Sequence, residues 1–492
     1  MQVLESVLQG FMADSHPLPS MGKAWVKRWS PKVQKGKGSL IHALCITPPK
    51  AIESMIWSLP PSKSHAIRWL ILAAQSEDET LIEGLEHAGQ DIVSMRRCLA
   101  QMGVQFTDLD AQGRPLSGDT NHDDQPASGS VAWKVHGSGM KGLNSPVSVL
   151  HAGNSGTTLR LLMALVTQFD VPVMLDGDAS LRSRRYAAML DAMDQFGVQR
   201  SHGLDEEGLP LLLQGPVQSG RELALNIASS SQPLSAWFLT APSLEHRVKL
   251  KQIGEPVSRR HSKLSLDMCA LTGAPTTLSD TLESWSVKVP NARVNLPRDA
   301  SMLAFAFLAV AVTGTTVVIP ERPLPEDSLG HEMLVDHAHA MGINVEGGTL
   351  SPHDSAQAID LDLRDANDLI TPVAALLALG SGGTLRGAAH AAHKESDRLK
   401  GSQDLLAQFG LKVSLMEDGL EIAGGQQLQQ PSGLVHTYGD HRMQMTALNL
   451  AMGCEGDVLI EGSSLHGVAD LMAVKRWQEA GVSIDEILHS SS

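Results

Sequence analysis

The segment SMRRCLAQMGV (Ser94–Val104) carries the pattern that decides the fold. Its apolar residues recur at helical spacing, and a glycine and an apolar residue follow. The pattern occurs six times, at glycine spacings of 94, 76, 69, 68 and 71 residues. The glycines are Gly103, Gly197, Gly273, Gly342, Gly410 and Gly481. Glycine after a helix is typical of a C′ position with positive φ, and a recurring unit predicts a repeat architecture.

A second helical pattern, apolar on most faces, also occurs six times and is expected in a core. Its members are Ser64–Ala74, Ser155–Val166, Ser231–Ala241, Ala300–Val312, Leu369–Leu379 and His441–Met452. Strand-like segments follow most of them: TLIEGL, VPVMLDG, RVKL, TTVVIP, TLRGA and DVLIEG. We therefore expect an α/β protein of six units, each with a buried helix, an exposed helix and short strands.

The chain has 492 residues, more than one hydrophobic core usually serves, so two or more domains are expected. Residues Met1–Gly38 show neither helical pattern, and we expect residues 1–38 to form a flexible extension. The stretch Asp108–Ser130 is rich in Asp, Gly, Ser and Asn, which predicts an exposed insertion.

The composition excludes several classes of function. A net charge of −15 argues against nucleic acid or an anionic membrane as a partner. The four cysteines lie far apart without a CxxC pair, which disfavours a zinc site and a disulfide framework. Leu303–Val312 is the longest apolar run and is too short to cross a bilayer. The N-terminus lacks the pattern of a secretory signal, so a cytoplasmic location is expected.

The buried helices begin with polar and cationic residues. The starts read PPSKSHAIR (Pro60–Arg68), AGNSGTTLR (Ala152–Arg160), ASSSQPLS (Ala228–Ser235), PRDAS (Pro297–Ser301), NDLITP (Asn367–Pro372) and YGDHRM (Tyr438–Met443). Helix N-termini bind anions, and Lys63, Arg68, Arg160 and Arg442 add positive charge. Capping alone would explain any one of these starts. Six of them in one repeat architecture favour a cleft that binds a polyanion.

Two further stretches place charge at helix starts: LRSRRY (Leu181–Tyr186) and HKESDRL (His393–Leu399). The second brings Lys394, Glu395, Asp397 and Arg398 together. One interpretation is a solvated helix start. The other is an acid–base carboxyl group whose pKa is perturbed by the lysine.

Over roughly Lys50–Val482 the sequence resembles the 5-enolpyruvylshikimate-3-phosphate synthase family. LPPSKSHAIR is similar to the family's LPGSKSxxxR, and GNSGTTLR to its GNAGTxxR. SSQPLSA, HKESDR and YGDHRM are similar to SSQxLSA, xKExDR and YxDHRM. Each motif alone is weak, but all five occur in the family's order at compatible spacing.

The resemblance implies a two-domain inverse α/β barrel of six βαββαβ units, three in each domain. One domain would be discontinuous, made of residues 39–60 plus 295–488, and residues 61–294 would be an inserted domain. The active site would lie in the cleft between them. The chain crossings near Pro60 and Asn295 would act as hinges.

The resemblance also implies the reaction. The 5-hydroxyl of shikimate 3-phosphate adds to C2 of phosphoenolpyruvate, a proton goes to C3, and the tetrahedral intermediate loses phosphate. Lys63, Asp368 and Glu395 match the family's catalytic positions: a lysine that bridges both substrates, the group that takes the hydroxyl proton, and the acid that protonates the enol carbon. Asp440 and His441 would orient them. No cofactor and no metal would be needed, and a monomer is expected.

The substrate positions are carried over residue by residue. Shikimate 3-phosphate would contact Lys63, Ser64, Arg68, Ser230, Ser231, Gln232, Ser258, Asp368 and Lys394. Phosphoenolpyruvate would contact Lys63, Asn154, Gly156, Arg184, Gln232, Arg398 and Arg442, with Thr157 in the same loop. Because Gly156 leaves room beside phosphoenolpyruvate, sensitivity to glyphosate is expected.

The sequence departs from the family's pattern in several places. Arg185 and Leu161 stand where proline is common, and His390 takes a position where asparagine is frequent. Two other departures involve longer stretches. Ser258–His261 reads SRRH where SxPY or SxPH is common, so Arg260 stands in the place of a proline and a different loop shape is expected. The family often has a lysine near the C-terminus that reaches phosphoenolpyruvate. Here the stretch reads LHGVADLMAVKRW, with His466 as a possible substitute and Lys475 too far along.

Three alternatives stay open at this point. One is a non-catalytic homologue that binds shikimate 3-phosphate, and its only support is the missing lysine. The second is UDP-N-acetylglucosamine enolpyruvyl transferase, which shares the fold but typically uses a loop cysteine and lacks the KSxxxR and KExDR motifs. The third is a structural solenoid, which would not need charged starts on buried helices.

Overall fold

The computed structural model describes residues 40–116, 125–202, 208–217, 222–228 and 230–490. The extension expected at residues 1–38 lies outside these ranges. One compact unit spans His42–Leu488. All the elements that carry the site described below belong to this unit. Among the described residues, no helix is both long and apolar enough to cross a membrane.

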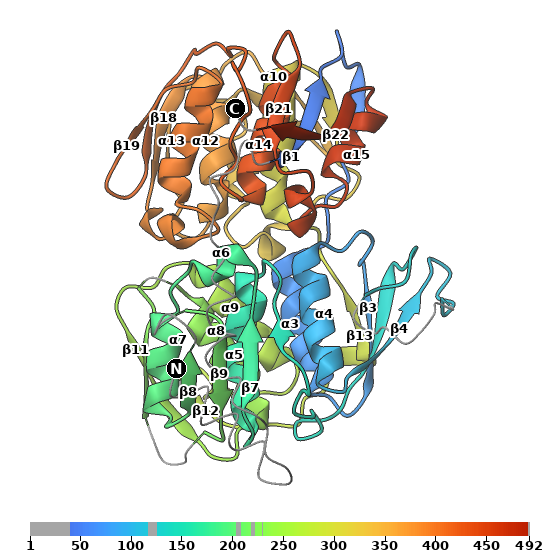
Figure 1. Ribbon diagram of the computed structural model, residues 1–492, viewed down its shortest axis with the longest axis vertical. Helices are drawn as coiled ribbons and strands as arrows, with labels where there is room; N and C mark the ends of the chain where they lie inside the picture. Colours follow the sequence, from blue (N-terminus) through green and yellow to red (C-terminus); the bar gives the residue numbers. More distant parts are fainter. Residues whose placement is uncertain (1–39, 117–124, 203–207, 218–221, 229, 491–492) are drawn as a thin grey trace, which may run out of the picture. The chain divides into compact units, whose positions relative to one another are not determined.

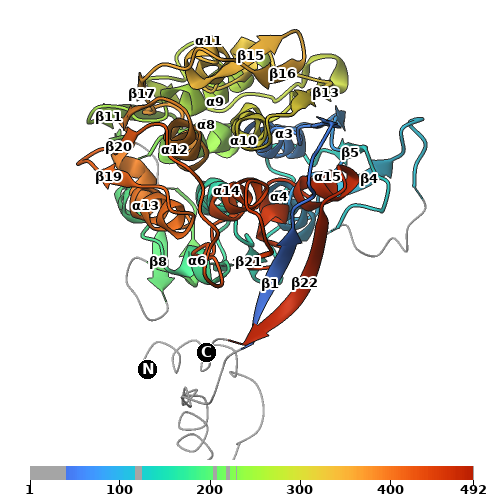
Figure 2. The ribbon, with the colours of Figure 1, turned by 90° about the horizontal axis from the view of Figure 1, so that it is seen from above.

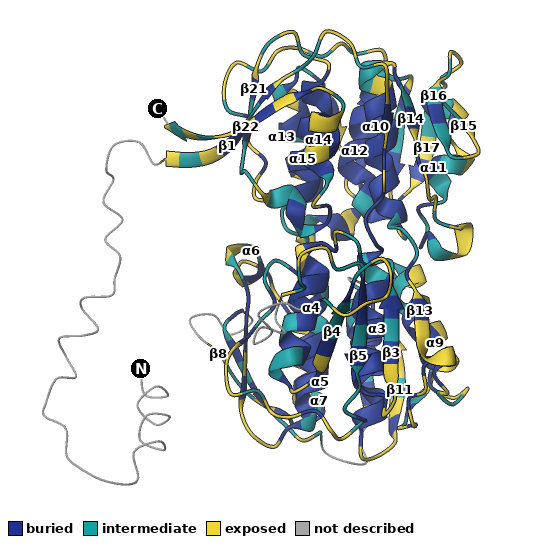
Figure 3. Ribbon diagram, turned by 90° about the vertical axis from the view of Figure 1, so that its right-hand side faces the viewer, coloured by how far each residue is buried: buried dark blue, intermediate teal, exposed yellow. Residues whose placement is uncertain are grey.

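The six apolar helices predicted from the sequence are present. They are α3 (Lys63–Ala74), α5 (Gly156–Leu165), α8 (Gln232–Thr240), α10 (Leu303–Thr313), α12 (Ile370–Leu379) and α14 (His441–Ala451). Short 3₁₀ turns, η5 (Ala300–Met302) and η8 (Asn367–Leu369), precede α10 and α12. Burial extends almost all round these helices, as Figure 3 shows for α10 and α12. The interpretation of the apolar runs as core helices is therefore confirmed.

The helices that precede the repeated glycines are also present, with one exception. They are α4 (Gln90–Gln101), α7 (Ala187–Gln195), α9 (Arg259–Leu271), α13 (Arg398–Gln408) and α15 (Ala473–Glu479). All six glycines have positive φ, as predicted. The fourth unit differs, because α11 (Met333–Asp336) stops and a 3₁₀ turn, His339–Met341, follows. Asp and His have low helix propensity, which agrees with this break. A short helix α6 (Ala179–Arg182) precedes α7.

The strands of the described residues form six small sheets. The three-stranded sheets are β21–β1–β22 (Val458–Glu461, Leu40–Thr47, Ser483–Ser490) and β10–β11–β12 (Glu222–Asn226, Val248–Ile253, Thr281–Leu282). Two four-stranded sheets are β13–β3–β5–β4 (Arg293–Asn295, Glu79–Glu83, Ala132–His136, Gln105–Leu109) and β6–β7–β9–β8 (Leu150–His151, Val173–Asp176, Leu211–Gln214, Gln199–His202). The others are β15–β16–β14–β2 (Ile343–Glu346, Thr349–Pro352, Thr316–Val318, Ser54–Ile56) and β17–β18–β20–β19 (Ile359–Asp362, Gly382–Arg386, Leu420–Ala423, Val413–Leu415).

The four-stranded sheets share one pairing scheme. An edge strand pairs in parallel with its neighbour, and the remaining pairs are antiparallel; β13, β3, β5 and β4 illustrate it. All six strand-like segments named from the sequence lie in strands: β3, β7, β11, β14, β18 and β21. The predicted insertion is partly a strand, because Asp108 belongs to β4. The next described residues, Asp110–Leu116, are mostly exposed, and residues 117–124 lie outside the described ranges.

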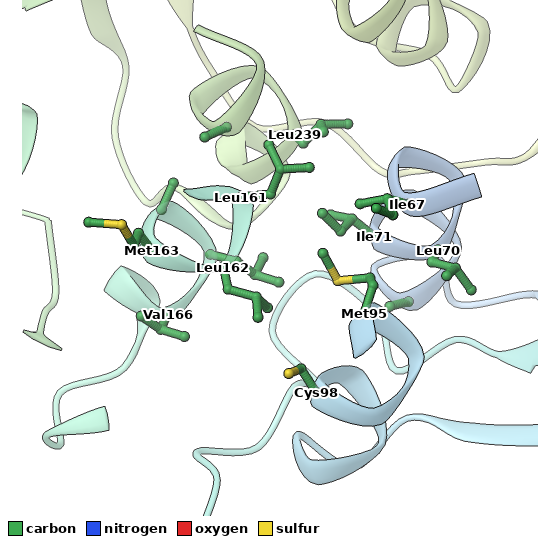
Figure 4. Close-up of a cluster of buried hydrophobic side chains, with 14 of the residues drawn as sticks. Ile67, Leu70, Ile71, Met95, Cys98, Leu161, Leu162, Met163, Val166 and Leu239 are labelled. Atoms are coloured by element: carbon green, nitrogen blue, oxygen red, sulfur yellow. The ribbon is translucent and has the colours of Figure 1, made fainter. Parts of the chain in front are cut away.

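The buried apolar side chains form two clusters. The first uses residues between Ala66 and Leu296, and the second uses Leu44–Leu59 together with residues from Met302 to Ile484. Figure 1 shows the elements of the two clusters as separate groups. In the first cluster, side chains from α3, α4, α5 and α8 meet (Figure 4). In the second, α10, α12 and α14 pack against one another, as Figure 2 shows.

Candidate active site

A cleft of about 570 Å³ is lined by residues from both clusters of elements. The starts of α3, α5 and α8 line it, as do the residues before α12 and α13. Seven cationic side chains line the cleft, against five acidic ones, within the described part of the chain. The cations are Lys63, Arg68, Arg160, Arg184, Arg185, Lys394 and Arg398. A chain with a net charge of −15 therefore keeps a locally cationic cleft, which suits small anions.

Lys63 lies in the first turn of α3, and its Nζ is 2.9 Å from Oδ2 of Asp91. Asp91 lies at the start of α4 and is 5% exposed. Burial and then Arg442 lower the pKa of Lys63. The carboxylates, Asp91 first and then Asp368 and Glu395, outweigh them and raise the pKa above its usual value. The amine is therefore protonated and held in the cleft wall.

Glu395 is held by two guanidinium groups. Its Oε2 lies 2.5 Å from Nη2 of Arg398, and its Oε1 lies 3.2 Å from Nη2 of Arg184. Burial raises the pKa of Glu395, but Arg398 and then Arg184 lower it, and the pKa lies well below its usual value. Glu395 is therefore a carboxylate in this structure, paired with cations that an incoming anion could contact.

Asp368 lies in η8, before α12, and also meets Arg398, whose Nη1 is 2.6 Å from Oδ1. Lys394 Nζ lies 4.0 Å from the same oxygen. Burial raises the pKa of Asp368, but Arg442, Lys394 and Arg398 lower it well below its usual value. Arg398 also forms an ion pair with Asp440, whose Oδ2 lies 2.9 Å from Nε of Arg398. Because burial lowers the pKa of Arg398 less than these carboxylates raise it, its pKa lies above the usual value.

All nine residues expected to bind shikimate 3-phosphate line the cleft: Lys63, Ser64, Arg68, Ser230, Ser231, Gln232, Ser258, Asp368 and Lys394. Arg68 is buried and donates to the Ser64 carbonyl and to Oγ of Ser265. Gln232 donates to Oγ1 of Thr157, 3.0 Å away. The starts of α8 and α5 are thereby linked.

The residues expected to bind phosphoenolpyruvate divide into two groups. Gly156, Arg184 and Arg398 line the cleft together with Lys63 and Gln232. Asn154 does not line it and donates instead to Asp178 and Ser180. Arg442 does not line it either; it donates to Ser301 Oγ and to the Asp368 carbonyl.

Gly156 lies against two arginines of the cleft wall. A Cβ built on Gly156 would stand 2.5 Å from Nη1 of Arg184 and 2.9 Å from Nη1 of Arg160. Arg160 also lies over the Tyr186 ring, with its Cζ 5.1 Å from the ring centroid. A side chain at position 156 would therefore displace guanidinium groups that line the cleft.

The loop Ser258–His261 departs from the family's pattern and forms its own contacts. Ser258 has a φ of +50°, and Arg259 pairs with Asp365 at 2.7 Å. Arg260, which stands where proline is common, lies 3.2 Å from Glu332. Both partners belong to the second group of elements, so the arginines connect the loop to it.

The C-terminal residues considered as substitutes for a lysine lie elsewhere. His466 contacts Gln444 and does not line the cleft. Lys475 is 60% exposed on α15 and pairs with Glu479. Neither reaches the cleft in this structure.

Several residues of the site were missed by reasoning from the sequence. Asp91, the partner of Lys63, carries no motif and stands at a helix start, where Asp is usual. His331 is buried beside the cleft residues and was not singled out. His390, noted from the sequence only as standing where asparagine is frequent, lines the cleft itself. The segment HAAHKESDR, dense in histidine, was a signal for His390.

The four cysteines lie outside this cleft. Burial raises the pKa of Cys98 to about 12. Within the described ranges, no group of three His, Cys, Asp or Glu side chains could hold a metal ion.

Comparisons with known proteins show the family of this chain. The family model described as EPSP synthase (3-phosphoshikimate 1-carboxyvinyltransferase) matches residues 46–468. The 3-phosphoshikimate 1-carboxyvinyltransferase of Methanothermobacter thermautotrophicus is 30% identical over 396 residues, covering 78% of this chain and 86% of that protein. That of Thermosynechococcus vestitus is 31% identical, covering 84% and 91%. The EPSP synthase structure from Acinetobacter baumannii superposes with a TM-score of 0.67 at 23% identity, covering 91% of this chain and 100% of that one. This last likeness concerns the mixed α/β fold.

Proposed function

We propose that this chain, which belongs to the EPSP synthase (3-phosphoshikimate 1-carboxyvinyltransferase) family, transfers the enolpyruvyl group of phosphoenolpyruvate to the 5-hydroxyl of shikimate 3-phosphate. Phosphate is the second product. The observation that carries the proposal is the cluster in which Lys63, Asp368 and Glu395 face one cationic cleft. Two phosphates and two carboxylates need such a set of cations.

The fold is proposed to be an inverse α/β barrel in each of two domains, with three βαββαβ units per domain. The six small sheets, of which the four four-stranded ones share one pairing scheme, support this arrangement. The proposed division is 39–60 plus 295–488 for one domain and 61–294 for the other. The two apolar clusters change over within a few residues of Pro60 and Asn295, which supports that division and hinges at these crossings.

Shikimate 3-phosphate is proposed to bind at the starts of α3 and α8. Ser64, Arg68, Ser230 and Ser231 would hold its phosphate, because helix starts and a guanidinium group favour a dianion. Ser258 would add a contact from the loop before α9. Lys394 and Asp368 would face the ring hydroxyl groups, and Gln232 would lie between the two ligands.

Phosphoenolpyruvate is proposed to bind between Lys63, Gly156, Arg184 and Arg398. Its phosphate and carboxylate would compete with Glu395 for the two guanidinium groups that now hold it. Arg442 and Asn154 lie outside the cleft in this structure, and they would act through their neighbours or after the cleft closes.

The acid–base steps follow from these charges. Asp368, as a carboxylate, would take the proton of the 5-hydroxyl while the oxygen attacks C2. Glu395 would deliver a proton to C3, for which it must first be protonated. Bound anions would neutralise Arg398 and Arg184, and this would raise the pKa of Glu395 towards a useful value. The intermediate then loses phosphate and a proton from the new methyl group, which restores the double bond.

The reaction is proposed to need no metal and no organic cofactor, because protons and charges are its only requirements. Phosphate release should persist in excess chelator. We also propose that the chain is a cytoplasmic monomer that binds these two small molecules and no nucleic acid or membrane. Light scattering of the purified protein tests the monomer.

The function is tested by phosphate release from purified protein given both substrates. Wild type should release phosphate, and Glu395→Gln and Asp368→Asn should each lower kcat by about 100-fold or more, the usual contribution of a general acid or base. Asp404→Asn, at a surface carboxylate paired with Lys400, is the control and should keep wild-type activity. If wild type binds shikimate 3-phosphate in calorimetry but releases no phosphate, the chain is a binding protein that kept the site.

A further inference from the structure

A second recess, of about 20 Å³, adjoins the cleft and shares Lys63, Ser64, His261 and Asp368 with it. Its other walls include Ser301, Asp327, His331 and Arg442. A recess of this volume accommodates about one water molecule, provided that two to four polar groups face it. Polar and charged side chains make up most of this lining.

His331 offers the recess an acceptor. The side chain is 4% exposed, and its Nδ1 lies 2.7 Å from the carbonyl of Ser328. A carbonyl only accepts, so Nδ1 carries the hydrogen. Burial lowers the pKa of His331 below its usual value, so the ring is neutral near pH 7. Its Nε2 is then an acceptor, and it is buried with no hydrogen-bond partner among the described residues.

Arg442 offers the recess a donor. Its side chain is 1% exposed, and its Nη2 and Nη1 are occupied by Ser301 and by the Asp368 carbonyl. Its Nε is buried and makes no hydrogen bond within the described part of the chain, although it lies 3.5 Å from Oδ1 of Asp368. One orphaned donor and one orphaned acceptor thus belong to residues of the same small recess. Leaving both unsatisfied would be unfavourable, because each buried group would lose its hydrogen bonds to water without a replacement.

We propose that this recess binds one water molecule, which accepts from Arg442 Nε–H and donates to His331 Nε2 and to the Asp368 carboxylate. His331 is thereby a positioning residue for Asp368. Its role in turnover rests on the proposed function, whereas the water site does not.

The water matters because the Asp368 carboxylate must pair with Arg398 and face the substrate hydroxyl in one and the same orientation. Its Oδ1 already meets Arg398, at 2.6 Å, and is approached by Lys394 and Arg442. A fixed water would hold the carboxylate against rotation, so that one oxygen keeps facing the substrate hydroxyl. Misplacement of a reacting group by about 1 Å can cost about 100-fold in rate, so a lost water should be visible in kcat.

Two substitutions of His331 separate this role from a structural one. The amide nitrogen of asparagine occupies the place of Nδ1 and can keep the hydrogen bond to the Ser328 carbonyl. The asparagine side chain has no atom in the place of Nε2, so it offers the water in the recess no acceptor. The amide of glutamine occupies the place of Nε2 and can still bond the water. We expect His331→Asn to lower kcat about tenfold or more with the KM values changed less than about threefold. His331→Gln should recover most of that loss.

The opposite order of activities would overturn the proposal, because it would assign the importance of His331 to its Ser328 bond. Equal loss in both variants, or no loss in either, would overturn it as well. Thermal unfolding of both variants checks that each is folded at the assay temperature.

A crystal structure of wild type and of His331→Asn supplies a readout that does not depend on activity. We expect a water within hydrogen-bond distance of Arg442 Nε and His331 Nε2 in wild type, and its loss or displacement in His331→Asn. A dry recess in wild type would overturn the water site. An inactive wild type with the ordered water would refute the proposed function and leave the water site standing.

Discussion

Arg184 Nη2 lies 3.2 Å from Glu395 Oε1, and this ion pair joins the segment after α6 to the segment before α13. The two side chains are only 7% and 11% exposed. Arg184 comes from the part of the chain that forms the first apolar cluster, and Glu395 comes from the part that forms the second. The ion pair therefore spans the cleft. An anion that binds between them must compete for Arg184, and the proton affinity of Glu395 depends on the outcome.

Arg184→Gln should raise the KM for phosphoenolpyruvate about tenfold or more, because a hydrogen bond to a charged group contributes about 1.5–3 kcal/mol. The KM for shikimate 3-phosphate should change little. Steady-state phosphate release with each substrate varied in turn measures both. Arg182→Gln is the matched control, since Arg182 is 52% exposed, pairs with Asp176 and does not line the cleft. Equal effects of the two substitutions would argue against a specific role for Arg184.

Gly156→Ala should raise the KM for phosphoenolpyruvate and weaken inhibition by glyphosate, because the added methyl group would stand within 3 Å of Arg184 and Arg160. Wild type should be inhibited by glyphosate, and added phosphoenolpyruvate should relieve that inhibition. Gly433→Ala is the control, because no atom lies within 4 Å of its built Cβ. Inhibition curves that coincide for wild type and Gly156→Ala would contradict the expected crowding.

The free energy of unfolding should fall as the pH is lowered through the acid range. Glu395 and Asp368 have folded-state pKa values well below their usual ones, after their cations outweigh burial. The stability that these two carboxylates contribute is therefore complete above the pKa range of ordinary carboxyl groups. It is lost as the pH falls towards their pKa values in the folded state. Urea unfolding at several pH values should show a shallower fall for Glu395→Gln than for wild type below about pH 5, and parallel curves above it. Parallel curves at all pH values would show that the pairs do not favour the folded carboxylate.

Asp440→Asn should destabilise the fold by about 3 kcal/mol, the usual order for removing one partner of a buried ion pair. Asp440 is fully buried, contacts Arg398 and caps α14 by accepting from the Arg442 backbone N–H. Asparagine can keep the cap, so the loss would report the charge. Asp404→Asn removes an exposed ion pair with Lys400 and should change stability by less than about 1 kcal/mol. Urea unfolding measures the free energy of unfolding of both variants. Equal losses of stability in Asp440→Asn and Asp404→Asn would refute the expectation.

The sequence by itself determined the elements of the fold and most of the cleft lining. Apolar periodicity and the glycines after helices are local properties, since they depend on φ and on the face that each residue presents. They predicted the six core helices, and the six glycines all have positive φ. The charged residues at helix starts can also be recognised from local sequence alone. The structure brings four of them into one cleft: Lys63, Arg68, Glu395 and Arg398.

The tertiary structure alone decided which side chains meet. Lys63 pairs with Asp91, and the recess brings His331 to Arg442, although nothing in the local sequence links these residues. Asn154 shares a motif with Gly156 yet contacts Asp178 outside the cleft. The physical reason is that a contact between distant segments depends on the packing of whole elements, which no short pattern encodes. The neighbouring cations then set the charge state of Glu395, because burial alone would raise its pKa, whereas Arg398 and Arg184 outweigh burial and hold the pKa well below its usual value.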